Sequence, residues 1–185
     1  MTFFLRDGIM KNMENSRKNI VLIGMPASGK STAGVLAAKT LGFGFIDTDL
    51  VIQTQEKKLL SEILQEKGIE EFIRIENRIN ASLWAERCVI STGGSVVYGE
   101  EAMEHLRSIG TIVYLKASYE EIARRLGNII LARGVVIRKG ESLRDLYDER
   151  VPLYEKYADY TVDCETHGVE DTVHAICLLA KDLDA

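Results

Sequence analysis

The sequence predicts an α/β protein whose five parallel strands form one sheet with helices on both faces. Five short apolar runs alternate along the chain with longer segments whose apolar residues recur at helical spacing. The first run also passes through a glycine-containing turn directly into such a helical segment. Both features are typical of a doubly wound sheet, because parallel strands need crossover connections. The runs expected to be strands are 19–23, 42–46, 88–92, 111–115 and 160–163.

The helical segments follow from the same periodicity, and glycine or proline marks where they break. Gly68 is expected to separate the second helix from the third, and Val151-Pro152 to interrupt the sixth. The expected helices are 31–41, 50–66, 69–86, 100–108, 119–126, 141–157 and 169–183. With no internal repeat and no linker, residues 18–185 are interpreted as a single domain, preceded by an N-terminal arm at 1–17.

The bulk composition is that of an ordinary globular protein, with 46% hydrophobic and 28% charged residues. A formal net charge of -5 argues against nucleic acid as the main partner. The three cysteines, Cys88, Cys164 and Cys177, form no C-x-x-C pair, which favours reduced thiols over a disulfide framework or a zinc site. No apolar run reaches membrane-spanning length. We therefore expect a cytoplasmic monomer without a membrane partner.

A phosphate-binding loop is the strongest motif in the chain. Gly24-Met25-Pro26-Ala27-Ser28-Gly29-Lys30-Ser31-Thr32 matches G-x-x-x-x-G-K-[ST], with a strand before it and a helix after it. Backbone N–H groups of the turn and the helix dipole would hold phosphates. Lys30 would reach the β- and γ-phosphates of a nucleoside triphosphate, and the hydroxyl of Ser31 would hold Mg²⁺. A glycine-rich turn that merely carries a lysine is the alternative, which the flanking strand and helix disfavour.

Two carboxylates, Asp47 and Asp49, follow the second expected strand directly. Ligands of open α/β sheets gather beyond the carboxyl ends of the strands, so these acids are placed to reach the phosphates. Because they alternate along the chain, one could serve the metal and the other an acceptor. Either could instead cap the next helix, and the two roles are compatible.

Two glycine-containing segments are further candidates. Gly93-Gly94 follows the third expected strand and indicates either close approach of the backbone to a ligand or simply a tight turn. The segment 127–140 contains Arg133, Arg138 and Lys139 but no acid. It is interpreted as a lid over phosphates, with an ordinary exposed loop as the alternative.

Together these motifs resemble the shikimate kinase family, within the nucleoside-monophosphate-kinase-like group of P-loop kinases. The resemblance covers nearly the whole chain after Arg17. It rests on G-M-P-A-S-G-K-S-T at 24–32, D-T-D at 47–49, G-I-E-E-F-I-R-I-E at 68–76, S-T-G-G-S at 91–95 and E-R-V-P-L-Y at 149–154. It implies a P-loop kinase fold with sheet order 2-3-1-4-5, a lid at about 127–140 and an acceptor-binding helical insert at about 49–80.

The resemblance also implies a role for particular residues. Asp47 would assist Mg²⁺, Asp49 would hold the acceptor hydroxyl, and Arg133 would be the lid arginine on the transferring phosphate. Arg125 would lie beside adenine, and Arg150 beside the acceptor's carboxylate. The expected nucleotide-binding residues are therefore Gly24, Ala27, Ser28, Gly29, Lys30, Ser31, Thr32 and Arg125, with Ser31 and Asp47 at the metal.

The acceptor side departs from the family pattern. Where the family motif F-R-x-x-E has an arginine that grips the acceptor carboxylate, this chain has Ile73. Arg74 lies one residue later, about 100° around the helix axis, so it cannot simply take over. The glycine triplet of the family ends here in Ser95, and the proline of the lid is Gly134. The expected acceptor-binding positions are Asp49, Ile73, Gly93, Gly94, Ser95 and Arg150.

These observations predict an ATP-dependent kinase that phosphorylates a small hydroxylated acceptor, with shikimate as the first choice. Lys30, Asp49 and Arg133 are the expected catalytic residues. A kinase for a different acceptor, and a nucleotide-binding regulatory module without acceptor chemistry, are the alternatives. A signalling GTPase is disfavoured because the chain has no N-K-x-D motif for guanine.

Overall fold

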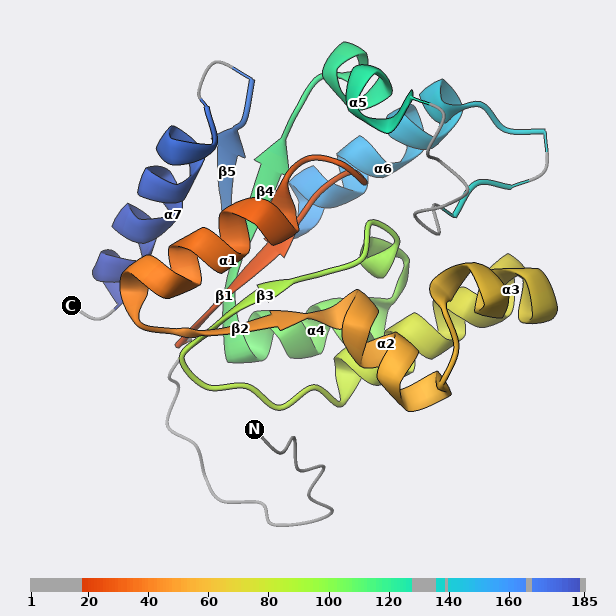
Figure 1. Cartoon of the computed structure of the whole chain (residues 1–185), viewed down its shortest axis with the longest axis horizontal. Coiled ribbons are helices and arrows are strands. Elements are labelled where there is room, and N and C mark those ends of the chain that lie inside the picture. The colour runs from red at the N-terminus through yellow and green to blue at the C-terminus, as the bar shows by residue number, and fades with distance from the viewer. Residues whose placement is uncertain (1–17, 128–135, 139, 166–167, 184–185) are drawn as a thin grey trace.

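The computed structural model describes residues 18–127, 136–138, 140–165 and 168–183. All its strands pair in parallel in one sheet, in the order β2-β3-β1-β4-β5 (Figure 1). The strands are β1 Asn19–Ile23, β2 Gly44–Asp47, β3 Cys88–Ser91, β4 Gly110–Lys116 and β5 Tyr160–Asp163. The fold class and the strand order expected from the sequence are confirmed.

Helices connect the strands in the expected alternation. They are α1 Lys30–Leu41, α2 Thr48–Glu56, α3 Leu60–Ala81, α4 Glu100–Ile109, α5 Tyr119–Leu126, α6 Leu143–Tyr157 and α7 Val169–Leu183, with a 3-10 turn, η1, at Val96–Tyr98. Gly68 breaks the helical geometry inside α3, with φ 77° and ψ 172°, which agrees with the expected break at this glycine. The expected continuous helix at 50–66 is wrong, because α2 ends at Glu56 and α3 begins at Leu60. The expected interruption of the sixth helix is wrong, because α6 runs through Pro152 without a break.

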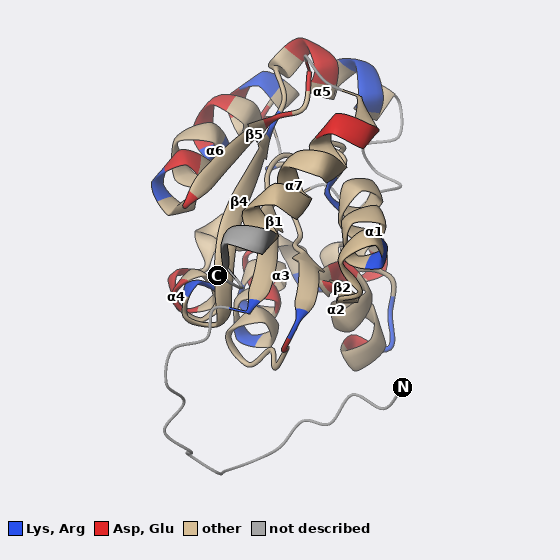
Figure 2. Cartoon of the chain, turned by 90° about the vertical axis from the view of Figure 1, so that its left-hand side faces the viewer, with Lys and Arg blue, Asp and Glu red and all other residues tan. Residues whose placement is uncertain are grey.

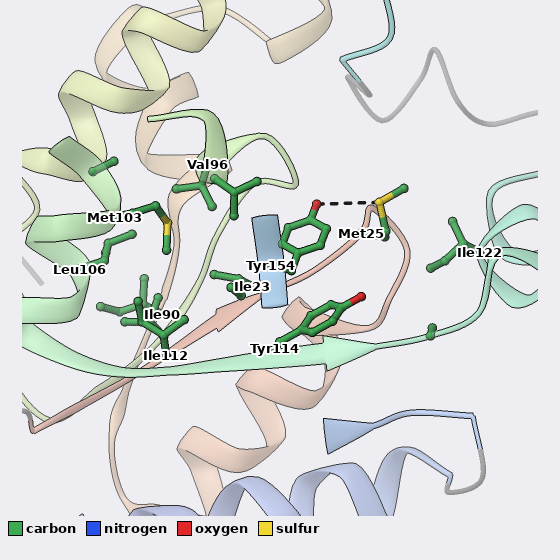
Figure 3. Close-up of a cluster of buried hydrophobic side chains, with 14 of the residues drawn as sticks. Ile23, Met25, Ile90, Val96, Met103, Leu106, Ile112, Tyr114, Ile122 and Tyr154 are labelled. Carbon is green, nitrogen blue, oxygen red and sulfur yellow. Dashed lines mark hydrogen bonds between the residues drawn. The ribbon is translucent and has the colours of Figure 1, made fainter. Parts of the chain in front are cut away.

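The sheet is covered on both faces, and β1 shows why. Ile20 and Leu22 point into a core shared with α1 and α7, while Val21 and Ile23 point into a second core shared with α4 and α6. Successive side chains of a strand face opposite sides, so a wholly apolar strand fits only between two layers of helices. All five residues of β1 are buried. Figure 3 shows the second core, with Ile23 near Tyr114 and Tyr154.

The strand order changes direction at β1, which lies between β3 and β4. The loop after β1 therefore opens into the crevice where ligands of doubly wound sheets bind. In Figure 1, α2 and α3 lie on one side of the loop after β1, and α5 and the start of α6 lie on the other side. A third apolar cluster, formed mainly by α2 and α3, supports that side independently of the sheet.

Charged side chains lie mainly on the outer helices, with both signs mixed, as Figure 2 shows. The central strand β1 carries none, and in β4 the only charge is on Lys116 at its end. Within the described residues, no helix combines the length and the apolar character needed to cross a membrane.

Candidate active site

The phosphate-binding loop leaves the N-terminus of α1 open. Gly29 is the N-cap residue with φ 101°, where only glycine is unstrained, and no side chain caps the helix. The first turn of α1 also carries no acidic residue. Gly24 and Ala27, earlier in the same loop, also have positive φ angles, of 144° and 64°. The unpaired N–H groups and the helix dipole therefore make a site suited to an anion.

Lys30 lies inside this loop, only 7% exposed. Its Nζ donates hydrogen bonds to the carbonyl oxygens of Gly24, at 2.8 Å, and Met25, at 2.9 Å. Burial lowers the pKa of Lys30 to about 8, against the opposing attraction of Asp49 and Asp47. A phosphate group bound in the loop would restore the charged form, because an opposite charge nearby raises the pKa of an amine.

Ser31 and Asp47 form the pair expected at the metal. The hydroxyl of Ser31 donates to Oδ2 of Asp47 at 2.8 Å and lies 3.1 Å from the hydroxyl of Ser91. The other carboxylate oxygen of Asp47 accepts a hydrogen bond from the backbone N–H of Asp49 and caps α2. Asp47 therefore caps α2 and also lies beside Ser31, so the two roles considered for it are compatible.

The donor set fits Mg²⁺ bound through a nucleotide. Magnesium is commonly held by one or two protein oxygens, with phosphates and water completing its octahedron. Ser31 and Asp47 supply a hydroxyl and a carboxylate beside the phosphate-binding loop. Among the described residues, no group of three or more histidines, cysteines or acids could hold a metal alone.

Asp49, in the first turn of α2, lines the central cavity. Burial, together with the like charge of Asp47, raises the pKa of its carboxyl to about 6 against the opposing effect of Lys30. Near neutral pH the group is therefore ionised but more basic than an exposed aspartate. That combination suits a side chain that orients a hydroxyl and accepts its proton.

The turn after β3 brings backbone close to these acids. Thr92 anchors it by donating from Oγ1 to the carbonyl oxygen of Leu22 at 2.9 Å. A Cβ at Gly93 would lie 2.9 Å from Oδ1 of Asp49, and one at Gly94 would lie 2.8 Å from the ring of Pro26. Neither glycine has a positive φ. These glycines are thus required for space and not for turn geometry.

Arg150 projects from α6 into the same cavity and is 1% exposed. Its Nε donates to the hydroxyl of Tyr98 at 3.1 Å, and a terminal nitrogen donates to the carbonyl oxygen of Val136 at 2.9 Å. The guanidinium also lies over the ring of Tyr98, 5.2 Å from its centroid. These contacts fix the orientation of a buried cation that faces the acids.

Arg125 marks the opposite end of the cavity. Its guanidinium donates to the carbonyl oxygens of Ala27, at 3.2 Å, and Ser28, at 3.3 Å, and pairs with Glu121 at 2.6 Å. Cys164 and Thr172, from the end of β5 and the start of α7, line the wall beside it. This end therefore extends outward from the phosphate-binding loop, where a base and ribose would follow a phosphate tail.

One cavity of about 690 Å³ joins these parts. Its lining includes Ala27, Ser28, Gly29, Lys30, Ser31, Thr32, Asp49, Phe72, Glu76, Gly93, Gly94, Ser95, Arg125, Val136 and Arg150. The cavity thus brings together most of the positions that the sequence analysis assigned to nucleotide and acceptor.

Three expected site residues lie elsewhere. Gly24 and Asp47 stand behind the lining, where they contact Lys30 and Ser31. Ile73 lines a small neighbouring recess together with Tyr98 and Arg138, and packs beside the apolar cluster of α2 and α3. Arg133, Gly134 and most of the expected lid at 127–140 lie outside the described residues.

The structure adds four residues that the sequence analysis did not assign to the site. Glu76 is buried in the cavity wall, and its signal was the acid that ends the family motif F-R-x-x-E. Tyr154 ends the motif E-R-V-P-L-Y and holds the backbone of Gly94 through its hydroxyl. Cys164 and Thr172 had no sequence signal, because their place at the cavity depends on how β5 and α7 pack.

The fold and the site define a P-loop phosphotransferase, because a phosphate-binding loop, a hydroxyl–carboxylate pair and a basic aspartate share one cavity. A family model described as shikimate kinase matches residues 26–179. The chain belongs to the shikimate kinase family.

Individual relatives agree with the family model. The chain is 38% identical to a shikimate kinase of Thermodesulfovibrio yellowstonii over 161 residues, covering 86% of this chain and 92% of the relative. It is 39% identical to a shikimate kinase of Parabacteroides distasonis over 165 residues, covering 86% and 95%. The solved shikimate kinase of Acinetobacter baumannii in complex with shikimate is similar with a TM-score of 0.80, 27% identity, and coverage of 91% and 95%.

Proposed function

We propose that this chain transfers the γ-phosphoryl group of MgATP to a hydroxyl of shikimate. One observation carries the proposal: the phosphate-binding loop with the Ser31–Asp47 pair, and the acceptor group of Asp49 and Arg150, line or flank the same cavity. The donor and acceptor ends are thus close enough for in-line transfer without rearranging the sheet. The matches to shikimate kinases over most of the chain support the choice of acceptor.

In this proposal, each residue supports a reaction dominated by positioning and electrostatics. Lys30 and the N–H groups at the start of α1 hold the phosphate tail and stabilise the charge that develops on the transferring group. Magnesium, held by Ser31 and Asp47, would neutralise charge between the phosphates. Asp49 orients the acceptor hydroxyl and accepts its proton, and Arg150 holds the acceptor's carboxylate.

A coupled assay of ADP release tests the proposal. Shikimate should raise turnover well above the background hydrolysis of MgATP. Asp49→Asn should lower this stimulated rate by at least about a hundredfold, because loss of one positioned group for proton transfer typically costs this much. MgATP affinity should change little, and Asp148→Asn, at an exposed position on α6, is the matched control.

Ile73 favours one second candidate, a kinase for a different small hydroxylated acceptor. An isoleucine leaves an apolar surface where the family motif places a guanidinium. The assay separates the two, since a panel of hydroxylated acids and polyols would then include a better substrate than shikimate. MgATP binding without acceptor-dependent turnover on any of these would instead indicate a regulatory module.

The same proposal places the enzyme in the cytoplasm as a monomer and gives it no nucleic-acid or membrane partner. It also retains the assignment of residues 127–140 as a lid over the phosphates. The acidic net charge of -5 argues against a nucleic-acid partner, and the absence of a C-x-x-C pair among the three cysteines is typical of reduced thiols in the cytoplasm. Light scattering of the purified chain should give the mass of a single copy, and a dimer mass would contradict this assignment.

A further inference from the structure

Glu76, on α3, is an acid that has no ion-pair partner among the described residues, at the acceptor end of the cavity. Its side chain is 1% exposed and lines the cavity. Neither of its carboxylate oxygens accepts a hydrogen bond of normal geometry from a described residue, although the hydroxyl of Ser95 lies close enough to lower its pKa. A buried polar group of this kind is uncommon, because leaving it unpaired is costly. The position therefore calls for a ligand group.

The identity of residue 73 explains why Glu76 is unpaired. Residues three apart on a helix are neighbours, so a cation at position 73 would stand beside Glu76. Ile73 supplies none. Arg74, the next residue, is turned to solvent and pairs with Glu71 at 3.2 Å, with its side chain 76% exposed. The change at position 73 thus removes the natural partner of Glu76 as well as a contact to the acceptor.

The other elements around Glu76 do not replace that partner. Asp49 of α2 repels it, whereas Lys30 of α1 and Arg150 of α6 attract it, and Ser95 is close enough to favour its charged form. Arg150 is engaged with Tyr98 and Val136. On α4, Glu101 is bound to Asn77, away from the cavity. Tyr154 of α6 also faces it, as a neutral phenol with a raised pKa. Burial outweighs these effects and raises the pKa of Glu76 to about 7.

We propose that Glu76 is a specificity-determining residue that binds the acceptor as a neutral carboxylic acid, donating a hydrogen bond to the acceptor's carboxylate. This inference rests on the function proposed above and names a contact that replaces the missing guanidinium. A carboxylate held beside an ionised Glu76 would be repelled in a site with little water. The neutral acid removes the repulsion and supplies a donor.

Proton uptake follows from this contact. Above the pKa of the free site, Glu76 is ionised, so the anionic acceptor binds only together with one proton taken from the buffer. The proton ends on the Glu76 carboxyl group, shared with the acceptor carboxylate, and no other bond changes. Acceptor affinity should therefore be highest below about pH 7 and fall by up to about tenfold per pH unit above it.

Calorimetric titration of shikimate in buffers of different ionisation enthalpy measures this uptake. The protein is first saturated with MgADP, so that the phosphates keep Lys30 charged and its titration does not contribute. At pH 7.5, where Asp49 is already ionised, the wild type should take up between about half and one proton per shikimate bound. Glu71→Gln, an exposed change on the same helix, should behave like the wild type.

Two variants at the contact sharpen the test. Glu76→Gln keeps a donor but cannot ionise, so it should bind shikimate without proton uptake and with affinity nearly constant between pH 6.5 and pH 8.5. Ile73→Arg should hold Glu76 ionised and thus also remove the uptake, while shikimate binds more tightly at pH 8. If Glu76→Gln does not fold, the loss of proton uptake in Ile73→Arg still tests the inference.

Results that would overturn only this inference differ from the result that would also contradict the proposed function. Shikimate binding by the wild type without proton uptake, or with uptake that persists in Glu76→Gln, overturns the inference and leaves the proposed function intact. A Glu76→Gln protein that binds MgADP but has lost shikimate at every pH also overturns it, because the amide can donate as well. No binding of shikimate by the wild type at any pH contradicts both this inference and the proposed function.

Discussion

The hydroxyl of Tyr154 donates a 2.6 Å hydrogen bond to the carbonyl oxygen of Gly94 and lies 3.8 Å from the sulfur of Met25 (Figure 3). A single residue of α6 thus contacts both the glycine turn at the acceptor end and the phosphate-binding loop. Its ring stacks on Tyr114 of β4, with centroids 5.1 Å apart, which fixes its position. Tyr154 therefore connects the two halves of the site through the core.

We predict that Tyr154→Phe weakens the acceptor end more than the nucleotide end. The change leaves the carbonyl of Gly94 unpaired, which should cost about 1–2 kcal/mol of stability. KM for shikimate should rise several-fold while KM for MgATP changes less, as steady-state kinetics would measure. Tyr157→Phe, on the same helix beside Lys156, is the control and should leave both values unchanged. Equal changes in both KM values would contradict a role centred on Gly94.

Lys30→Ala should abolish turnover and preserve the fold. The buried ammonium group donates to two carbonyl oxygens of the phosphate-binding loop and would lie beside the phosphate tail. Its loss should lower kcat by at least about a hundredfold, as removal of one charge-stabilising group typically does. Circular dichroism should show unchanged helix content. Lys39→Ala, in the last turn of the same helix, should keep full activity, and unchanged activity of Lys30→Ala would remove the assignment of the phosphate site.

Ile73→Arg should improve shikimate binding. A charge-assisted hydrogen bond to the acceptor carboxylate contributes roughly 1.5–3 kcal/mol, which corresponds to about one to two decades in affinity. Direct titration of shikimate measures this gain. Arg74→Ala is the matched control, since that side chain is exposed and should not affect the acceptor. No gain in Ile73→Arg would indicate an acceptor of a different shape.

The acids in the cavity should make the protein less stable as pH rises toward 8. Glu76 has a pKa near 7 in the folded state against 4.5 ordinarily, so the folded state binds the extra proton. Its contribution to stability is full below about pH 4.5 and is lost as pH rises through 7, at a cost on the order of 3 kcal/mol. Asp49, with a pKa near 6 against 3.8, acts in the same direction over a lower range.

Thermal unfolding at pH 5 and pH 8 measures this loss. For a chain of this size, each kcal/mol shifts Tm by about 2–4 °C. Tm of Glu76→Gln should fall less between the two pH values than Tm of the wild type, because the amide does not titrate. Glu71→Gln, which is exposed, should follow the wild type. Parallel curves for wild type and Glu76→Gln would show that Glu76 does not carry the proton.

Local patterns in the sequence were enough to determine the order of strands and helices, the phosphate-binding loop and the two acids after β2. Each depends on residues close together in the chain: an apolar run, a glycine-containing turn or a carboxylate at a strand end. The chain order of elements was therefore readable, and the resemblance to shikimate kinases supplied the sheet order that the structure confirms. Pro152 misled the prediction, because α6 continues through it.

Packing between distant segments decided the rest. The raised pKa of Glu76 depends on burial among α1, α2 and α6, and the role of Tyr154 depends on α6 lying beside the turn after β3. The sequence showed that Ile73 stands where the family motif has an arginine. It did not show that Ile73 lies in the recess beside Tyr98 and Arg138. Sequence patterns report which groups are present and how they are spaced. Only the tertiary structure determines which of them lose water and which find a partner, and those two facts control the charge of a buried acid.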